Sequence, residues 1–175
     1  MTETDDLELK SLDVAAGSLN LTVGADLTAT LAKASVDATL QVTGSAEVSS
    51  LAVGGDLVIG TGGLLDVASL TGQSAVVTSG GTTKLNGSLD DLTLTSAQSA
   101  EVTEADSLMA LGISIMDGDL SLAAGVDIVL KGGVLASGDV ILDAGRLKEG
   151  SISNSSEDAL VAGETLSLTA TGDIH

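Results

Sequence analysis

Aliphatic and polar residues alternate in short runs along the whole chain. The runs SLNLT, DLSLA and TLSLT each place two leucines around one polar residue, as Leu19 and Leu21 flank Asn20. Successive side chains of a β-strand point to opposite faces, so a period of two is typical of strands. The pattern therefore predicts many short strands whose leucines face a core and whose polar residues face solvent.

A glycine turn precedes many of these strands. The recurring unit has one or two small residues, a glycine, a polar or acidic residue and then the alternating run, because the turn needs the conformational freedom of glycine. Its spacing varies, since the interval from Val140 to Leu166 is longer than the interval from Leu120 to Val140. The eight copies lie at Ala15–Leu21, Val23–Leu31, Val53–Ile59, Met116–Leu122, Ala123–Leu130, Ala136–Leu142, Val161–Leu168 and Ala170–Ile174. This recurrence predicts a repetitive β-structure.

The core of such a structure must be aliphatic. The 175 residues are 43% hydrophobic but include no Phe, Tyr, Trp, Pro or Cys. A β-sandwich usually draws on aromatic residues for its core. In a parallel β-helix, coils stack at about 4.8 Å around a narrow lumen, and proline would remove a hydrogen bond between coils. We therefore expect an all-β parallel β-helix of about six to eight irregular coils with an aliphatic core, in which a Trp at Leu122 or Leu168 overpacks the lumen.

The distribution of the pattern predicts the domain organisation. Residues 12–175 carry it and predict a single β-helix domain, whereas residues 1–11 hold four acids and predict an acidic N-terminal tail or cap on the first coil. Residues 96–111 have Ala, Glu and Met at helix-compatible spacing, and we favour an irregular coil or strand there over a short helix. Residues 146–156 are polar and predict a protruding loop.

Acidic residues dominate the charge. The 25 Asp and Glu against 6 scattered Lys and Arg give a net charge of −19. Nucleic acid and anionic membranes require clustered basic residues, so neither is an expected partner. No run approaches the ~20 apolar residues of a membrane span, so no membrane insertion is expected. The start MTETDDLELK lacks the features of a signal peptide, which suits a cytoplasmic protein or an internal piece of a longer exported chain.

Catalytic chemistry has few candidates. The chain has no Cys, and its one histidine is His175, so thiol, Ser-His and zinc chemistry are excluded and no catalytic or cofactor-binding residue is assigned. A polysaccharide-acting enzyme would rest on paired carboxylates, at Asp90 with Asp91 or at Asp117 with Asp119. It would lack the aromatic rings on which sugar substrates stack. We therefore expect no enzyme.

Calcium is the metal ion whose ligands are most abundant here, since it binds several oxygens at once. Neither an EF-hand loop nor a glycine-rich nonapeptide repeat occurs. The candidate metal ligands are Asp56, Asp117, Asp119 and Asp139. The repeated Gly-Asp turns predict that Asp56, Asp119, Asp139 and Asp173 lie along one edge, where diffuse cation binding is favoured over a specific calcium site.

One part of the chain resembles a known repeat family. The segment GDLSLAAGVDIVLKGGVLASGDVILDAG at Gly118–Gly145, with VAGETLSLTATGDI near the C-terminus, is similar to the haemagglutinin repeats of filamentous haemagglutinin-type exoproteins. These are two-partner-secreted adhesins and contact-dependent inhibition proteins of Gram-negative bacteria. The resemblance implies a right-handed β-helix that serves as an adhesive or structural stalk outside the cell or on its surface. Its partners would be neighbouring coils of a longer chain, further copies of the chain, or a host-cell or bacterial surface.

Two other classes of protein remain open. A bactofilin-like cytoplasmic scaffold would stack its β-helices end to end, and the absence of a signal peptide favours it, whereas the acidic first ten residues oppose polymerisation at that end. The other open class is a polysaccharide-acting β-helix enzyme or a calcium-binding repeat module, which is less favoured than the stalk or the scaffold. Unbranched polymers in electron micrographs would distinguish the scaffold from the stalk.

Overall fold

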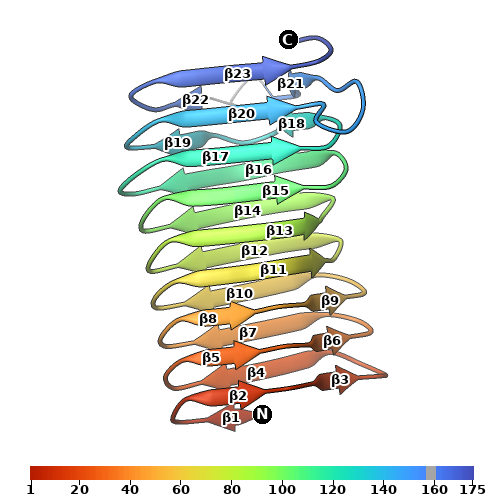
Figure 1. Cartoon of the computed structure of the whole chain (residues 1–175), viewed down its shortest axis with the longest axis vertical. Helices are drawn as coiled ribbons and strands as arrows, with labels where there is room; N and C mark the ends of the chain where they lie inside the picture. The colour runs from red at the N-terminus through yellow and green to blue at the C-terminus, as the bar shows by residue number, and fades with distance from the viewer. Residues whose placement is uncertain (157–160) are drawn as a thin grey trace.

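The computed structural model describes residues 1–156 and 161–175, and these residues form 23 β-strands and no helix. No described segment is a helix long and apolar enough to cross a membrane. The strands wind into a right-handed parallel β-helix with the chain termini at opposite ends of the stack (Figure 1). The expected fold class is confirmed.

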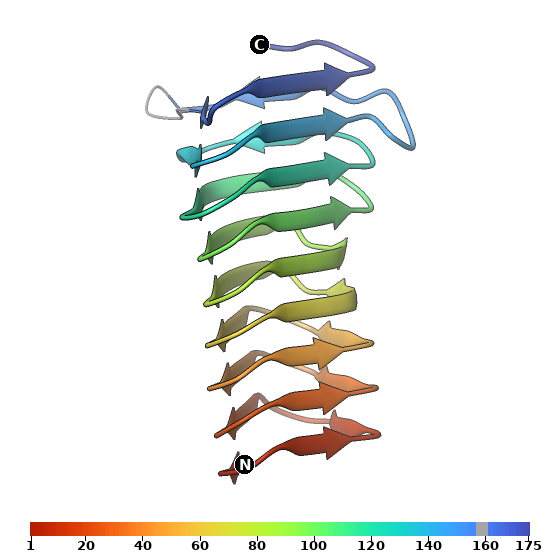
Figure 2. The same cartoon turned by 60° about the vertical axis from the view of Figure 1, so that its left-hand side comes forward.

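Two parallel sheets form the long walls of the coils (Figure 2). Sheet A contains β1 (Thr2–Glu3), β4 (Leu19–Val23), β7 (Ala38–Val42), β10 (Leu57–Thr61), β12 (Ser74–Ser79), β14 (Asp91–Ser96), β16 (Leu108–Ile115), β18 (Ile128–Leu130), β19 (Val134–Ala136), β21 (Ile152–Asn154) and β22 (Val161–Ala162). Sheet B contains β2 (Leu7–Leu9), β3 (Leu12–Val14), β5 (Leu27–Ala29), β6 (Ala32–Ala34), β8 (Ala46–Val48), β9 (Leu51–Val53), β11 (Leu65–Thr71), β13 (Thr83–Ser88), β15 (Ala100–Glu104), β17 (Leu120–Ala124), β20 (Val140–Ala144) and β23 (Leu166–Ala170). Each strand pairs with the equivalent strand one coil away.

The coils differ in length. Along sheet B, Leu7 pairs with Leu27 and Thr83 pairs with Ala100, so the second of these coils is the shorter. From Leu7 the ladder takes eight steps, to Leu27, Ala46, Leu65, Thr83, Ala100, Leu120, Val140 and Leu166. This number lies within the expected six to eight coils.

Longer coils have a third side, whose position changes along the stack. Near the N-terminus, β3, β6 and β9 follow a bend in sheet B, whereas near the C-terminus the bend falls in sheet A, between β18 and β19. The shorter coils between them have one strand on each wall, as β14 and β15 do. A coil as short as the one from Thr83 to Ala100 has no length left for a third side.

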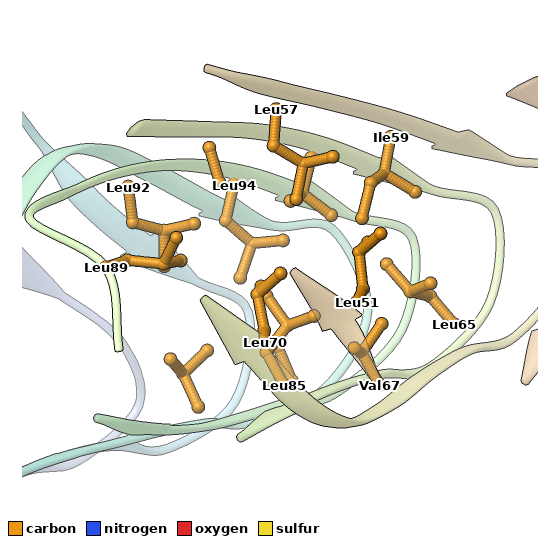
Figure 3. Close-up of a cluster of buried hydrophobic side chains, with 14 of the residues drawn as sticks. Leu51, Leu57, Ile59, Leu65, Val67, Leu70, Leu85, Leu89, Leu92 and Leu94 are labelled. Carbon is orange, nitrogen blue, oxygen red and sulfur yellow. The ribbon is translucent and has the colours of Figure 1, made fainter. Parts of the chain in front are cut away.

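Aliphatic side chains fill the lumen between the walls (Figure 3). Leu51 of sheet B and Ile59 of sheet A point toward one another, and each is 1% exposed. Similar residues stack from coil to coil, and Leu122 lies between Val102 and Leu142. Complete burial of one such side chain contributes roughly 1.5–3 kcal/mol. Repetition of this contact in every coil is the main source of stability.

Hydroxyl groups replace aliphatic residues at one inward position of the shorter coils. Thr61, Ser79 and Ser96 are stacked at the end of sheet A, and all are buried. Ser79 Oγ donates a hydrogen bond to the Gly63 carbonyl oxygen at 3.0 Å, and Ser96 Oγ donates one to the Gly81 carbonyl oxygen at 2.9 Å. These hydroxyls therefore hold the tight turns that lead to sheet B.

The two ends of the stack differ. Glu3 occupies an inward position beside buried Val23 and is half-buried, and an inward-pointing charge opposes the pairing of a further strand. At the other end, Leu166 and Leu168 of β23 occupy inward positions but are 48% and 36% exposed. Among the described strands, β23 pairs with β20 alone, whereas Leu122 is 0% exposed, so the overpacking expected for a Trp is kept at Leu122 and revised downward at Leu168.

Three segments that the sequence pattern set apart lie within the stack. Residues 1–11 contain β1 and β2, which pair with β4 and β5 as part of the first coil. Residues 96–111 contain β15 and the start of β16, which form strands because strands on both sides supply their hydrogen bonds. Residues 146–156 contain a turn, in which Arg146 and Leu147 donate backbone hydrogen bonds to Ala124 and Gly125, and then β21.

Candidate functional site

Aspartate and serine side chains connect the turns that precede the sheet B strands. The Asp26 backbone N–H donates to Asp6 Oδ1 at 3.1 Å, and the Ser45 N–H donates to Asp26 Oδ1 at 2.7 Å. Farther along the same corner, the Asp139 N–H donates to Asp119 Oδ1 at 2.8 Å. Each of these carboxylates thus accepts a hydrogen bond from the coil that follows it.

The turns that precede the sheet A strands use the same arrangement. The Asp56 N–H donates to Asp37 Oδ1 at 3.0 Å, and Ser74 Oγ donates to Asp56 Oδ1 at 3.0 Å. The Ser151 N–H donates to Asp127 Oδ1 at 2.8 Å, and the Asp173 N–H donates to Ser151 Oγ at 3.2 Å. Both corners are therefore stabilised by polar side chains that bridge successive coils.

The expectation that Asp56, Asp119, Asp139 and Asp173 lie along one edge is wrong. Asp56 and Asp173 belong to the corner before sheet A, whereas Asp119 and Asp139 belong to the corner before sheet B. Each coil has two such turns, half a coil apart, and a Gly-Asp pair does not distinguish them. Asp117 is exposed in the turn before Asp119.

The described residues contain no group of three or more His, Cys, Asp or Glu side chains placed to hold a metal ion. The candidate pair Asp90 and Asp91 lies where the chain enters β14, and both backbone N–H groups donate to the Gln73 carbonyl oxygen. The aspartates at the corners stack at most in pairs from adjacent coils, as Asp119 and Asp139 do, with no third described acid close enough to complete a site. A calcium site formed by several carboxylates would require them side by side.

Glu104 is a buried acid that the sequence analysis did not single out. It lies at an inward position of β15 and is 3% exposed. Its Oε2 accepts the Leu89 N–H at 2.9 Å, and its Oε1 accepts the Ala105 N–H at 2.8 Å. Burial raises the pKa of Glu104 to about 7, despite these hydrogen bonds, which favour the ionised form. The nearby Asp106 carboxylate raises this pKa further.

A shallow cavity of about 420 Å³ lies beside this glutamate, lined by Asn86, Thr103, Glu104, Ala105, Gly125, Arg146 and Leu147. A buried group with a raised pKa beside a cavity is a usual mark of a functional site. Here, however, both carboxylate oxygens hold backbone N–H groups where β13 ends and β15 ends. The arrangement primarily anchors two turns. The period of two in AEVTE was the signal that would have found Glu104, because it shares the inward parity of Ala100 and Val102.

The outer faces of the two sheets differ in charge. On sheet A, two rows of outward side chains follow the strands from β4 to β16. One row contains Asn20, Thr39, Val58, Val76, Thr93 and Gly112, and the other contains Thr22, Gln41, Gly60, Thr78, Thr95 and Ser114. All twelve residues are uncharged, and we call this surface the neutral face.

The outer face of sheet B is charged. Glu47, Asp66, Lys84 and Glu101 follow one another along β8, β11, β13 and β15. Lys84 Nζ lies 3.6 Å from Glu101 Oε2. A broad hollow of about 480 Å³ on this face is lined by both polar and apolar groups, among them Lys84 and Ile141.

These features define a β-solenoid with an aliphatic lumen, hydrogen-bonded corners and two uncharged rows of outward residues on sheet A. A scan against protein-family models and searches of curated proteins and of solved structures found no match to this chain.

Proposed function

We propose that this chain is a non-catalytic β-helical stalk segment of a bacterial surface or secreted exoprotein. The observation that carries the proposal is the continuous ladder of eight steps from Leu7 to Leu166, closed at both corners by side-chain hydrogen bonds. Such a stack holds its two ends apart at a fixed distance. It also leaves the corner turns free to present loops to a host-cell or bacterial surface.

The surface chemistry supports a structural role. The buried acid Glu104 already binds two backbone N–H groups, and the aspartates at the corners bridge coils. These groups are thus engaged in holding the fold. The negative charge of −19 keeps a β-rich surface from aggregating.

Surface labelling tests this proposal. An antibody raised against the purified chain is applied to intact and to permeabilised cells of the source bacterium, with a cytoplasmic protein as the control for leakage. Labelling of intact cells, lost on brief protease treatment, is the expected result. Labelling only after permeabilisation would contradict an exported stalk.

A cytoplasmic scaffold that stacks end to end is the second candidate. It is favoured by β23, which exposes Leu166 and Leu168 at inward positions and, among the described strands, pairs with β20. Electron microscopy of the purified protein at micromolar concentration tests it. Unbranched filaments that disappear in Leu168→Lys but persist in the control Ile141→Lys, on the outer face of sheet B, would favour the scaffold.

A further inference from the structure

We propose that the neutral face of sheet A joins two copies of this chain in a symmetric, face-to-face dimer. This goes beyond a stalk role, because it specifies which wall of the coil takes part in assembly and what covers it. In such a dimer the same surface of each copy packs against itself about a two-fold axis.

The distribution of charge selects this face. Each copy carries a net charge of −19, so two copies repel one another at most approaches. The corners carry Asp26, Asp37 and Asp119, and the outer face of sheet B carries Glu47 and Asp66. Contact through the neutral face brings uncharged rows together, leaves Asp37 and Asp91 at the rim, where water screens them, and keeps Glu47 and Asp66 on the far wall of each copy.

The neutral face carries two exposed valines beside a hollow. Val58 and Val76 project from it and are 40% and 46% exposed. Beside them lies a hollow of about 410 Å³, lined also by Gln41, Gly60 and Thr78. The side-chain amide of Gln41 lies over Gly60, so the hollow is bounded by this amide and by the two valines, against which a valine of the other copy would pack. The two valines give this otherwise polar surface a small apolar centre, which contact with a second copy would bury.

The face is also regular enough for two sheets to pack. Strands β4, β7, β10, β12 and β14 pair without a register shift. Adding β16, the six strands at about 4.8 Å, each about 16 Å long, give a footprint of roughly 460 Å² for each copy. The total of roughly 900 Å² is near the lower limit for a specific interface, in the range of weak and transient contacts. The dimer is therefore expected to be reversible and to depend on protein concentration.

Sedimentation velocity tests the proposal on the whole chain from about 1 µM to about 1 mM. The expected result is a monomer that converts to a dimer with rising concentration, and more readily at high salt, because salt screens the repulsion. A monomer throughout this range at both low and high salt would overturn the proposal.

Two matched substitutions locate the contact. Val76→Glu places a charge on the neutral face, and Ile141→Glu places the same charge on sheet B, at a residue of similar exposure (44%). We expect Val76→Glu to weaken dimerisation at least tenfold and Ile141→Glu to leave it within about twofold. Equal loss in both variants, or a dimer unchanged in Val76→Glu, would overturn the assignment. Thr78→Glu serves in its place where circular dichroism shows that Val76→Glu is unfolded.

Discussion

Glu104 is a buried acid, so ionising its side chain lowers the stability of the folded protein. Its folded-state pKa of about 7 lies above the ordinary value of 4.5, so the folded protein holds this proton more tightly than the unfolded chain. The contribution of Glu104 to stability is therefore greatest below about pH 4.5, falls as the pH rises toward 7, and is constant above that. In the protonated form the buried carboxyl carries no charge.

We predict that Glu104→Gln changes the pH dependence of unfolding. Between pH 4.5 and 8, the wild type should lose about 3 kcal/mol relative to this variant, because only the wild type must ionise a buried group. Urea denaturation at both pH values measures the difference, and other carboxylates cancel in the comparison. Glu101→Gln, on the outward side of the same strand, is the control. Parallel curves for wild type and Glu104→Gln would contradict the predicted cause.

Residue parity assigned most of the lumen correctly and also pointed inward at Glu104, but residue type argued against its burial. Leu19, Leu21, Leu120 and Leu122 lie inside as their alternation predicts. Glu104 has the same parity as its buried neighbours, but acidic residues are rarely buried, so a pattern of residue types places it outside. Glu104 is held inside because its carboxylate accepts hydrogen bonds from the Leu89 and Ala105 N–H groups. The sequence pattern does not show this need for acceptors, because it depends on the conformation of the two turns.

At the scale of the strand and turn, the aspartates at the corners are structural. We predict that Asp26→Ala destabilises the fold by about 0.5–1.5 kcal/mol, because the Ser45 N–H loses its acceptor at 2.7 Å. Asp26→Asn retains a side-chain oxygen and should stay within about 0.5 kcal/mol of the wild type. Chemical denaturation measures both, with the exposed Glu47→Ala as control. Equal effects at Asp26 and Glu47 would show that only charge matters.

An aromatic side chain should destabilise the fold at lumen positions that have a coil on both sides. Leu122→Trp is predicted to destabilise the fold by about 1–3 kcal/mol or more, since Leu122 is 0% exposed. Leu168→Trp should cost less than about 1 kcal/mol, because no described strand encloses the far side of β23. Thermal unfolding followed by circular dichroism compares the two variants. A cost at Leu168 as large as that at Leu122 would indicate that β23 is covered in solution.

Strands were most predictable where local pattern and stacking agree. Residues 118–145 alternate regularly and form β17, β18, β19 and β20. Residues 96–111 were ambiguous, because Ala, Glu and Met tolerate a helix, and pairing with β13 and β17 decides for strand at β15. The corner to which each aspartate belongs was not predictable, since the number of residues between turns varies from coil to coil.

At the scale of the whole molecule, repulsion between acidic side chains opposes the stacking of coils, whereas burial of aliphatic side chains in the lumen favours it. Acidic residues at both corners recur at the spacing of the coils, about 4.8 Å for adjacent strands. We predict that raising NaCl from about 10 mM to about 0.5 M increases the Tm, because salt screens this repulsion. Calcium at matched ionic strength should give a similar shift through diffuse binding. Stabilisation by micromolar calcium would instead reveal a specific site.

The class of fold was accessible from composition and period, but the function was not. The absence of aromatic residues and proline, together with glycine turns and alternating aliphatic residues, is enough to predict a parallel β-helix. The structure is right-handed, as the resemblance to haemagglutinin repeats implies. Those same residues serve only to pack and turn. An exported stalk, an end-to-end scaffold and the dimer at the neutral face therefore remain predictions for the experiments described above.

The uneven coil length has a consequence for how this chain tolerates change. Since the coil from Val140 to Leu166 is much longer than the coil from Thr83 to Ala100, register is set by the strands and not by a fixed count. An insertion or deletion at a corner displaces one turn and leaves every other rung paired. Such a chain can gain or lose surface loops during evolution while its internal repeat fades, because nothing in the architecture selects for a constant period.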